Sequence, residues 1–328
     1  MDTWAAASAR IPRQMKLMLD FPKPMAEQQY DAMAPGKTRN VDQFDTLRKY
    51  GFWSLMIPLT EIYAGVVALN DQSVHHPAFH FARIEQVRNV EQQLDHWLEQ
   101  LPSHLHNTPE NVRHHANGGV GRNFIWLHAA YHHHSQLLYY QFLRPSSEPR
   151  TDSNVEEDYF ASRCKAHAVA LSQLLWTANT TAGLECLWIN IGHLLVITSC
   201  VHLHTLLLDH NEFRLAQAKQ LLERNFIMLL QLQKYWPSLS LSMSRLRAFH
   251  QSCRTSTEAT FDMDNWMLHF LQEYASPVTD RLTQYDRDAC TSPLCLMDSP
   301  NPLLPFHQEV QEGTAMQQRG AAMLQTFL

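Results

Sequence analysis

The chain has 328 residues, 45% of them hydrophobic, so it can bury a sizeable core as one large domain or two small ones. It contains only 10 glycines, whereas leucine, alanine, glutamine and methionine are abundant, which favours an all-helical protein. The formal net charge is −6, while a compact nucleic-acid-binding domain is normally basic, because lysine and arginine must neutralise phosphates. The charge therefore argues against direct nucleic-acid contact by this chain.

The N-terminal part divides near residue 40. Residues 5–19 are compatible with one helix, and prolines and a glycine then interrupt the chain. From residue 41 the sequence becomes more apolar, and the run Phe52–Leu69 predicts a helix. Pro58 within this run marks either the start of the helix or a kink. We therefore expect an N-terminal segment, residues 1–40, before a helical domain.

The next two helices are separated by a polar stretch. Between Ile84 and Leu101 apolar side chains recur every three or four positions, which predicts an amphipathic helix with one buried face that ends at Pro102. Residues 103–121 are polar and finish in a glycine-rich loop, Asn117–Gly121. A helix rich in tyrosine and histidine is then expected from Phe124 to Leu143.

The second half of the chain also favours helices. A surface linker is expected at residues 145–152, and a proline-rich, glutamine-containing tail follows residue 277. We predict an all-α fold: one multi-helix domain over residues 41–276, and a mostly disordered tail over 277–328 with room for a short terminal helix. The apolar, helix-forming stretches of this half are 155–179, 184–209, 215–236, 239–253 and 266–274.

One segment, Ile189–Leu208, is apolar over roughly the length of a membrane-spanning helix. Polar side chains at its density are costly in lipid, so a helix buried in the middle of a bundle explains it better, and no membrane partner is predicted. The polar residues are Asn190, His193, Thr198, Ser199, His202, His204 and Thr205.

The six cysteines do not form a disulfide framework in a chain of this length. Cys290 and Cys295 are separated by four residues, and structural zinc sites usually begin with a closer pair and need a second one, so we predict free thiols in a loop. The remaining four lie in apolar helical stretches, which indicates buried free thiols and a reducing compartment. They are Cys164, Cys186, Cys200 and Cys253.

Histidines are the most obvious candidates for a metal site, because the chain has 20 of them. His128 and His132 are four residues apart on an expected helix and could bind one ion. Consecutive residues from His132 to His134 point about 100° apart, so they cannot all reach it. Partly buried histidines held by local hydrogen bonds are the favoured interpretation. No GxGxxG, Walker A or GxSxG motif occurs, so we assign no catalytic, cofactor-binding or metal-binding residue, and a histidine-based metal-dependent enzyme is the least favoured alternative.

Short motifs in a fixed order, over roughly residues 40–275, link the chain to a known family. The motifs are Leu47–Phe52 with Ile57–Tyr63; Leu94, Trp97, Leu101, Pro102 and Leu105 as L-x-x-W-x-x-x-L-P-x-x-L; Leu127–Tyr131 through Phe142–Pro145; Trp236–Pro237; and Trp266–Tyr274. Together they resemble the regulatory domain, often called the middle homology region, of fungal zinc binuclear cluster transcription factors. Each motif alone is mainly a packing pattern, and their order and spacing carry the resemblance.

The resemblance implies a helical transcription-regulator control domain in the nucleus. The family reads DNA with a six-cysteine module holding two zinc ions, and this sequence has no CxxC pair and no adjoining basic run. Zinc is therefore expected only in that module. Either the chain is part of a longer protein that carries the module, or it is a variant acting through partners. Expected partners are related transcription regulators, as homo- or heterodimers, and a small-molecule effector. The alternative is a DNA-independent interaction protein that heterodimerises with such regulators.

A pocket for an effector is a further hypothesis from the sequence. Polar groups inside very apolar helices suggest one near Trp188, His193, His202 and Tyr131. A ligand there would act by binding one state of the domain better than another. Simple core packing is the competing explanation for the same residues.

Overall fold

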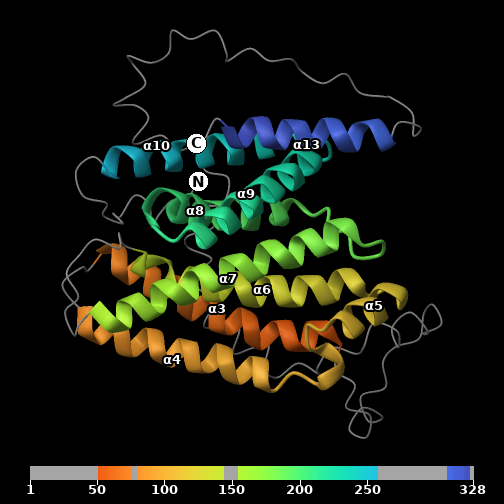
Figure 1. Ribbon diagram of the computed structural model, residues 1–328. Coiled ribbons are helices and arrows are strands. Elements are labelled where there is room, and N and C mark those ends of the chain that lie inside the picture. The colour runs from red at the N-terminus through yellow and green to blue at the C-terminus, as the bar shows by residue number, and fades with distance from the viewer. Residues whose placement is uncertain (1–50, 76–79, 144–153, 258–308, 326–328) are drawn as a thin grey trace, which may run out of the picture. The chain divides into compact units, whose positions relative to one another are not determined.

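The computed structural model describes residues 51–75, 80–143, 154–257 and 309–325, drawn as ribbons in Figure 1. They form α-helices and two short 3-10 helices, and these ranges contain no strand. The all-α class expected from the sequence is therefore confirmed.

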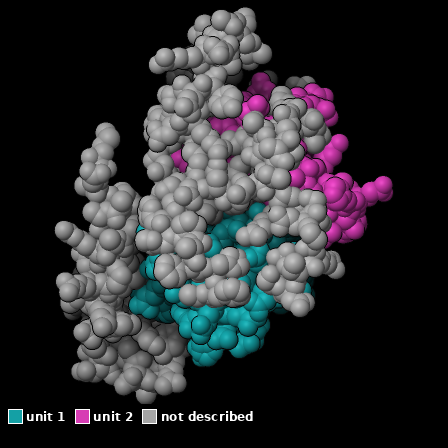
Figure 2. Space-filling view, turned by 90° about the vertical axis from the view of Figure 1, so that its left-hand side faces the viewer, with its two compact units in different colours: residues 1–143, 151–186 teal, residues 144–150, 187–328 magenta. Residues whose placement is uncertain are grey.

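The described helices cluster into two compact units, which Figure 2 draws in teal and magenta. The described part of unit 1 ends at Cys186, and that of unit 2 begins at Leu187. Several expectations lie outside the described residues and stay predictions: the borders at residues 40 and 276, the helices at 5–19 and 266–274, and the linker at 145–152.

In unit 1, helix α6 packs against each of the other four α-helices. Most residues of α6 are buried because neighbours cover it on several sides. The elements of unit 1 are α3 (Phe52–His75), α4 (His80–Glu99), η2 (Ser103–Leu105), α5 (Pro109–Asn117), α6 (Gly121–Tyr139), η3 (Tyr140–Phe142) and α7 (Asn154–Thr180).

Pro58 lies inside α3, which already begins at Phe52, so the proline does not mark the helix start. The start is fixed upstream, where the Ser54 hydroxyl and backbone N–H both donate to the Gly51 carbonyl at 2.7 and 3.0 Å. Polar bonding at the helix end therefore sets the boundary, and α3 tolerates the donor missing at Pro58.

Helix α5 is a short element within the polar stretch that the sequence pattern left without a helix. Thr108 caps it, because its side-chain oxygen accepts from the Asn111 N–H at 3.3 Å, and Pro109 occupies the first helical position. Gly119, with φ of 76°, then turns the chain into α6. The glycine loop is shorter than the expected Asn117–Gly121, because Asn117 ends α5 and Gly121 begins α6.

In unit 2, α8 packs on α9 and α10, and α13 packs on α9. The contacts are close: a Cβ added at Gly192 of α8 would lie 2.3 Å from the Leu239 side chain, and one at Gly320 of α13 would lie 2.6 Å from Ile227. Helix α13 is the short terminal helix that the sequence allowed. The elements are α8 (Ile189–Leu208), α9 (Glu212–Gln233), α10 (Leu239–Thr257) and α13 (Glu309–Gln325).

Two described helices, α3 and α8, are long and apolar enough to cross a membrane. In α8, 78% of the apolar window is buried within the protein, as expected for a core helix, whereas in α3 the share is 28%. Several polar side chains of α8 share this burial, among them Ser199, His202 and Thr205.

Candidate functional site

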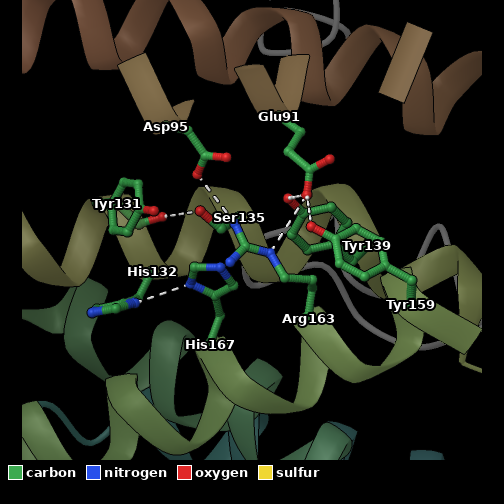
Figure 3. A network of polar contacts seen from close by, with 9 residues as sticks. All are labelled: Glu91, Asp95, Tyr131, His132, Ser135, Tyr139, Tyr159, Arg163 and His167. Carbon is green, nitrogen blue, oxygen red and sulfur yellow. Dashed lines mark hydrogen bonds and ion pairs between the residues drawn. The ribbon is translucent and has the colours of Figure 1, made fainter. Parts of the chain in front are cut away.

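A network of polar contacts joins three helices of unit 1 (Figure 3). Its centre is Glu91 of α4, a buried carboxylate. Glu91 Oε1 accepts hydrogen bonds from the Tyr139 hydroxyl at 2.7 Å and from the Tyr159 hydroxyl at 3.1 Å. Tyr139 lies on α6 and Tyr159 on α7, so one carboxylate oxygen connects all three helices.

Arg163 of α7 lies between the two carboxylates of α4 (Figure 3). Its Nη2 donates to Asp95 Oδ1 at 3.1 Å, and its Nε lies 3.5 Å from Glu91 Oε1, which is an ion pair without hydrogen-bond geometry. The guanidinium carbon also lies 5.8 Å from the centre of the Tyr139 ring. Arg163 thus ties α7 to α4 across a tyrosine of α6.

Residue spacing explains why these groups meet. Glu91 and Asp95 are four residues apart on α4, and Tyr159 and Arg163 are four apart on α7, so each pair shares one helix face. Glu91 also falls four residues after Val87, on the buried face of the amphipathic α4. The sequence signal for this site is a charged residue, Glu91, at a position of the helix repeat where apolar residues are expected. This signal was not recognised from the sequence.

A histidine pair continues the network. His132 of α6 and His167 of α7 face each other with 3.1 Å between their Nδ1 atoms, so one ring donates and the other accepts. Burial lowers the pKa of His167 to about 3, with added repulsion from His132 and Arg163. Burial also lowers the pKa of His132 to about 3. Both rings are therefore neutral at pH 7.

The tyrosines of the network stay protonated for a related reason. Burial, and then the hydrogen bond to Glu91, hold the pKa of Tyr139 well above its usual value. The donors of the network, two tyrosine hydroxyls and a guanidinium, are thus paired with its acceptors, two carboxylates. This arrangement supports a structural link between α4, α6 and α7.

The remaining histidines of α6 have separate partners. His128 donates through Nε2 to the Leu105 carbonyl at 2.9 Å, while His132 contacts His167, so the two do not share a partner. His134 stacks on Tyr63 of α3 with ring centres 4.3 Å apart. Local contacts of this kind agree with the favoured interpretation of these histidines. Within the described residues no group of three or more His, Cys, Asp or Glu side chains could hold a metal ion.

The cysteines of the described residues are buried thiols. Cys164, Cys186 and Cys200 are buried thiols outside any disulfide, as expected. Cys253, Cys290 and Cys295 lie outside the residues whose side chains are described. Burial raises the pKa of Cys186 to about 12 and that of Cys164 further, so both stay protonated at pH 7.

A second junction in unit 1 is centred on Trp97 of α4. Its indole N–H donates to the Leu55 carbonyl of α3 at 2.9 Å. Its ring stacks on Tyr131 of α6, with centres 5.7 Å apart and planes 16° from parallel. Leu94, Leu101 and Leu105 around it are all buried. Trp97 therefore brings together three segments that are far apart in the sequence.

The residues of the hypothetical effector pocket divide between the units. Tyr131 belongs to unit 1, whereas Trp188, His193 and His202 belong to unit 2. His193 and His202 are nine positions apart on α8, which places them about 180° apart around the axis and about 13 Å apart along it. These two side chains do not converge, and the pocket stays a prediction.

Comparison with known proteins gave no match: no protein-family model, no curated protein and no solved structure is significantly similar to this chain.

Proposed function

We propose that the chain is the helical control domain of a nuclear transcription regulator and acts through protein partners without contacting DNA. The junction at Trp97 is the observation that carries this proposal. Trp97 comes from the L-x-x-W-x-x-x-L-P-x-x-L motif, Tyr131 from the histidine- and tyrosine-bearing motif, and Leu55 from the helix containing the Ile57–Tyr63 motif. Three motifs whose order in the sequence resembles the regulatory domain of one family thus also contact one another in the folded chain.

The charge supports the part of the proposal that concerns DNA. The formal net charge of −6 disfavours contact with phosphates, and the sequence has six cysteines without a CxxC pair. Contact with DNA would come from a zinc-binding module elsewhere, and the domain described here would modulate its activity.

A reporter assay tests this function. The full chain is fused to an unrelated DNA-binding module and placed upstream of a reporter gene in yeast. We expect the fusion to change reporter output, upward or downward, relative to the module alone and to the module fused to an unrelated helical protein. Equal output from all three, at equal protein levels by immunoblot, would contradict the proposal.

Two tryptophan variants sharpen the assay. Trp97→Phe removes the indole donor to Leu55 within the junction, whereas Trp53→Phe changes a tryptophan of α3 whose side chain is 58% exposed. We expect Trp97→Phe to reduce the reporter effect and Trp53→Phe to preserve it. A larger loss of the reporter effect in Trp53→Phe than in Trp97→Phe would show that regulation does not depend on the Trp97 junction.

The second candidate is a DNA-independent interaction protein that heterodimerises with related regulators. The formal net charge of −6, which disfavours contact with phosphates, is compatible with it. A tagged chain purified from its native cells should then recover proteins that carry six-cysteine modules. Recovery of the tagged chain alone, or only of copies of itself, would count against this candidate.

A further inference from the structure

Helix α3 carries apolar side chains on its exposed side as well as on its packed side. Leu59 and Val66 are fully buried on the packed side. The exposed side of a surface helix is normally charged or polar. In α3, however, residues 52–70 contain a single charged residue, Glu61, and 28% of the apolar window of the helix is buried. Apolar surface of α3 is therefore available to a partner.

Five residues of α3 form a stripe along the exposed side. They recur every three or four positions, which places them on one face of the helix. Trp53 is 58% exposed, and Thr60 and Ala68 are exposed as well. Ile57 and Ala64 are half-buried. We call Trp53, Ile57, Thr60, Ala64 and Ala68 the α3 stripe. All but the threonine are apolar, so covering the stripe is favourable.

The size and charge of the α3 stripe limit what can cover it. A stripe about 22 Å long and about 10 Å wide offers roughly 200 Å², whereas a stable interface between separate proteins uses about 800 Å² of each partner. Insertion into lipid is disfavoured, because Glu61 lies beside the middle of the stripe. A segment of the same chain needs less contact area, since the tether gives it an effective concentration on the order of millimolar. The observations therefore favour an occupant from this chain.

The sequence supplies such a segment shortly before α3. A helix is expected within residues 5–19, and Pro12 marks its start or a kink in it. Ile11, Met15 and Met18 recur at i, i+4 and i+7, so the three side chains share one face of the expected helix. This apolar face is about as long as half of the stripe, which has room for it.

Charge and chain length both allow the segment to reach the stripe. Residues 5–19 carry three cations and no acid, opposite in sign to Glu61. Arg13 and Lys16 fall on the side of the expected helix away from Ile11. The 31 residues from 20 to 50 can span up to about 100 Å, while α3 is about 36 Å long. The connection is therefore long enough for contact anywhere along α3.

We propose that residues 11–18 dock as an amphipathic helix on the α3 stripe of the same molecule. Ile11, Met15 and Met18 would cover the stripe, and Arg13 and Lys16 would stay in water. The contact removes apolar surface from water on both helices, which is its driving force. The proposal goes beyond the regulatory function, since it concerns a contact within one chain.

Photo-cross-linking in the full chain tests this contact. Photoreactive benzoylphenylalanine is placed at Met15 in one protein and at Arg13 in a second, and the cross-linked peptides are identified by mass spectrometry. We expect the probe at Met15 to link to α3 between Trp53 and Ala68. The probe at Arg13 should give at least about fivefold less of this product, because it faces away from the stripe. The yield should not change over about a hundredfold range of protein concentration, as for a tethered contact.

Substitutions in the stripe then test its role with the probe kept at Met15. The double variant Ile57→Lys/Ala64→Lys places two cations in the stripe and should lower the cross-link yield by about tenfold, because the docked segment would bury them and is itself basic. Val155→Lys/Ala166→Lys is the matched control, since both residues are exposed on α7, and its yield should equal that of the wild type. Circular dichroism verifies that both variants fold, and Ala68→Lys, at an exposed position, serves if the first does not.

Several results would overturn the proposal. Cross-links from position 15 that avoid α3, or no cross-link at all, would exclude the contact. Cross-linked dimers whose yield rises with concentration would show that a second copy covers the stripe. Absence of the α3 product combined with sedimentation on phosphatidylserine vesicles would assign the stripe to a lipid surface. Equal yields in the stripe variant and its control would also contradict it. The reporter assay does not require this contact, so the two proposals fail separately.

Discussion

The two units stabilise their interiors by different means. In unit 1, a buried carboxylate, two tyrosines, an arginine and a histidine pair link α4, α6 and α7. In unit 2, buried polar side chains of α8 such as Thr198 and Thr205 bond to carbonyls of their own helix, and the small residues Gly192 and Gly320 let the helices approach one another closely. Polar networks respond to charge and pH, whereas close-packed apolar contacts respond to volume. We therefore expect a change in pH to destabilise mainly unit 1, and a change in side-chain volume to destabilise mainly unit 2.

The largest expected effect is acid destabilisation, concentrated in unit 1. In unit 1, burial lowers the pKa of His128 to about 4 and those of His132, His134 and His167 to about 3, and it also lowers the pKa of His115. In unit 2, burial lowers the pKa of two histidines, His193 to about 4 and His202 to about 3. The folded state keeps these rings neutral, whereas the unfolded chain takes up protons as the pH falls through about 6.5. Stability is thus greatest above pH 7 and declines toward pH 4, by about 2 kcal/mol for each such histidine between pH 7 and pH 5.

Hydrogen exchange measures this difference unit by unit. Between pH 7 and pH 5.5, after correction for intrinsic exchange, α6 and α7 should lose more protection than α8 and α9. His134→Phe should reduce the pH dependence of the unfolding free energy by about one proton. Equal losses in both units would contradict the comparison.

Removing the central carboxylate is the next largest change. Glu91→Ala leaves the Tyr139 hydroxyl without its acceptor and Arg163 with Asp95 alone, so we expect about 3 kcal/mol of destabilisation in urea unfolding. Glu85→Ala removes an exposed carboxylate from the same helix and should cost less than about 0.5 kcal/mol. Similar losses for both variants would mean that the network contributes little.

Adding one methyl group tests the packing of unit 2. A Cβ at Gly192 would lie 2.3 Å from Leu239, so Gly192→Ala should destabilise by about 1–2 kcal/mol despite the better helix propensity of alanine. Gly65→Ala in α3 meets its nearest atom at 3.8 Å and should stabilise by about 0.5 kcal/mol. In thermal unfolding, we expect Gly192→Ala to lower the melting temperature and Gly65→Ala to raise it. If both substitutions raised it, Leu239 would have to move aside at little cost.

The smallest effect is expected at the edge of the network. Tyr159→Phe deletes a donor to Glu91 from a side chain that is 50% exposed, so the loss should be about 0.5 kcal/mol. Tyr139→Phe removes the buried donor to the same oxygen and should cost about 1–2 kcal/mol. Equal costs would indicate that burial does not matter at this carboxylate.

Much of the fold follows from local sequence. The periodicity of α4 and the apolar run of α8 predicted their positions, because burial of one face or of a whole helix leaves a repeating pattern. Helix α5 was missed because it has almost no apolar face, and its signal is the cap at Thr108 followed by Pro109. Short capped helices are set by hydrogen bonds that periodicity does not detect.

The polar network could not be predicted from the sequence, for a different reason. Asp95 and Arg163 are separated by 68 positions, and nothing local identifies one as the partner of the other. A charged residue on a buried helix face, such as Glu91, indicates that some partner must exist, since an unpaired buried charge is costly. Which helix supplies the partner is decided by the packing of α4, α6 and α7.

The shared acceptor at Glu91 has a consequence for how such chains diverge. Four side chains depend on one another across three helices, so a change at one position is tolerated best when another changes with it. Homologous sequences should therefore vary jointly at Glu91, Tyr139, Tyr159 and Arg163, with loss of the acid accompanied by loss of the arginine. The half-exposed Asp95 should vary more freely than Glu91. Joint substitution at the other four positions would show that the network is inherited as one unit.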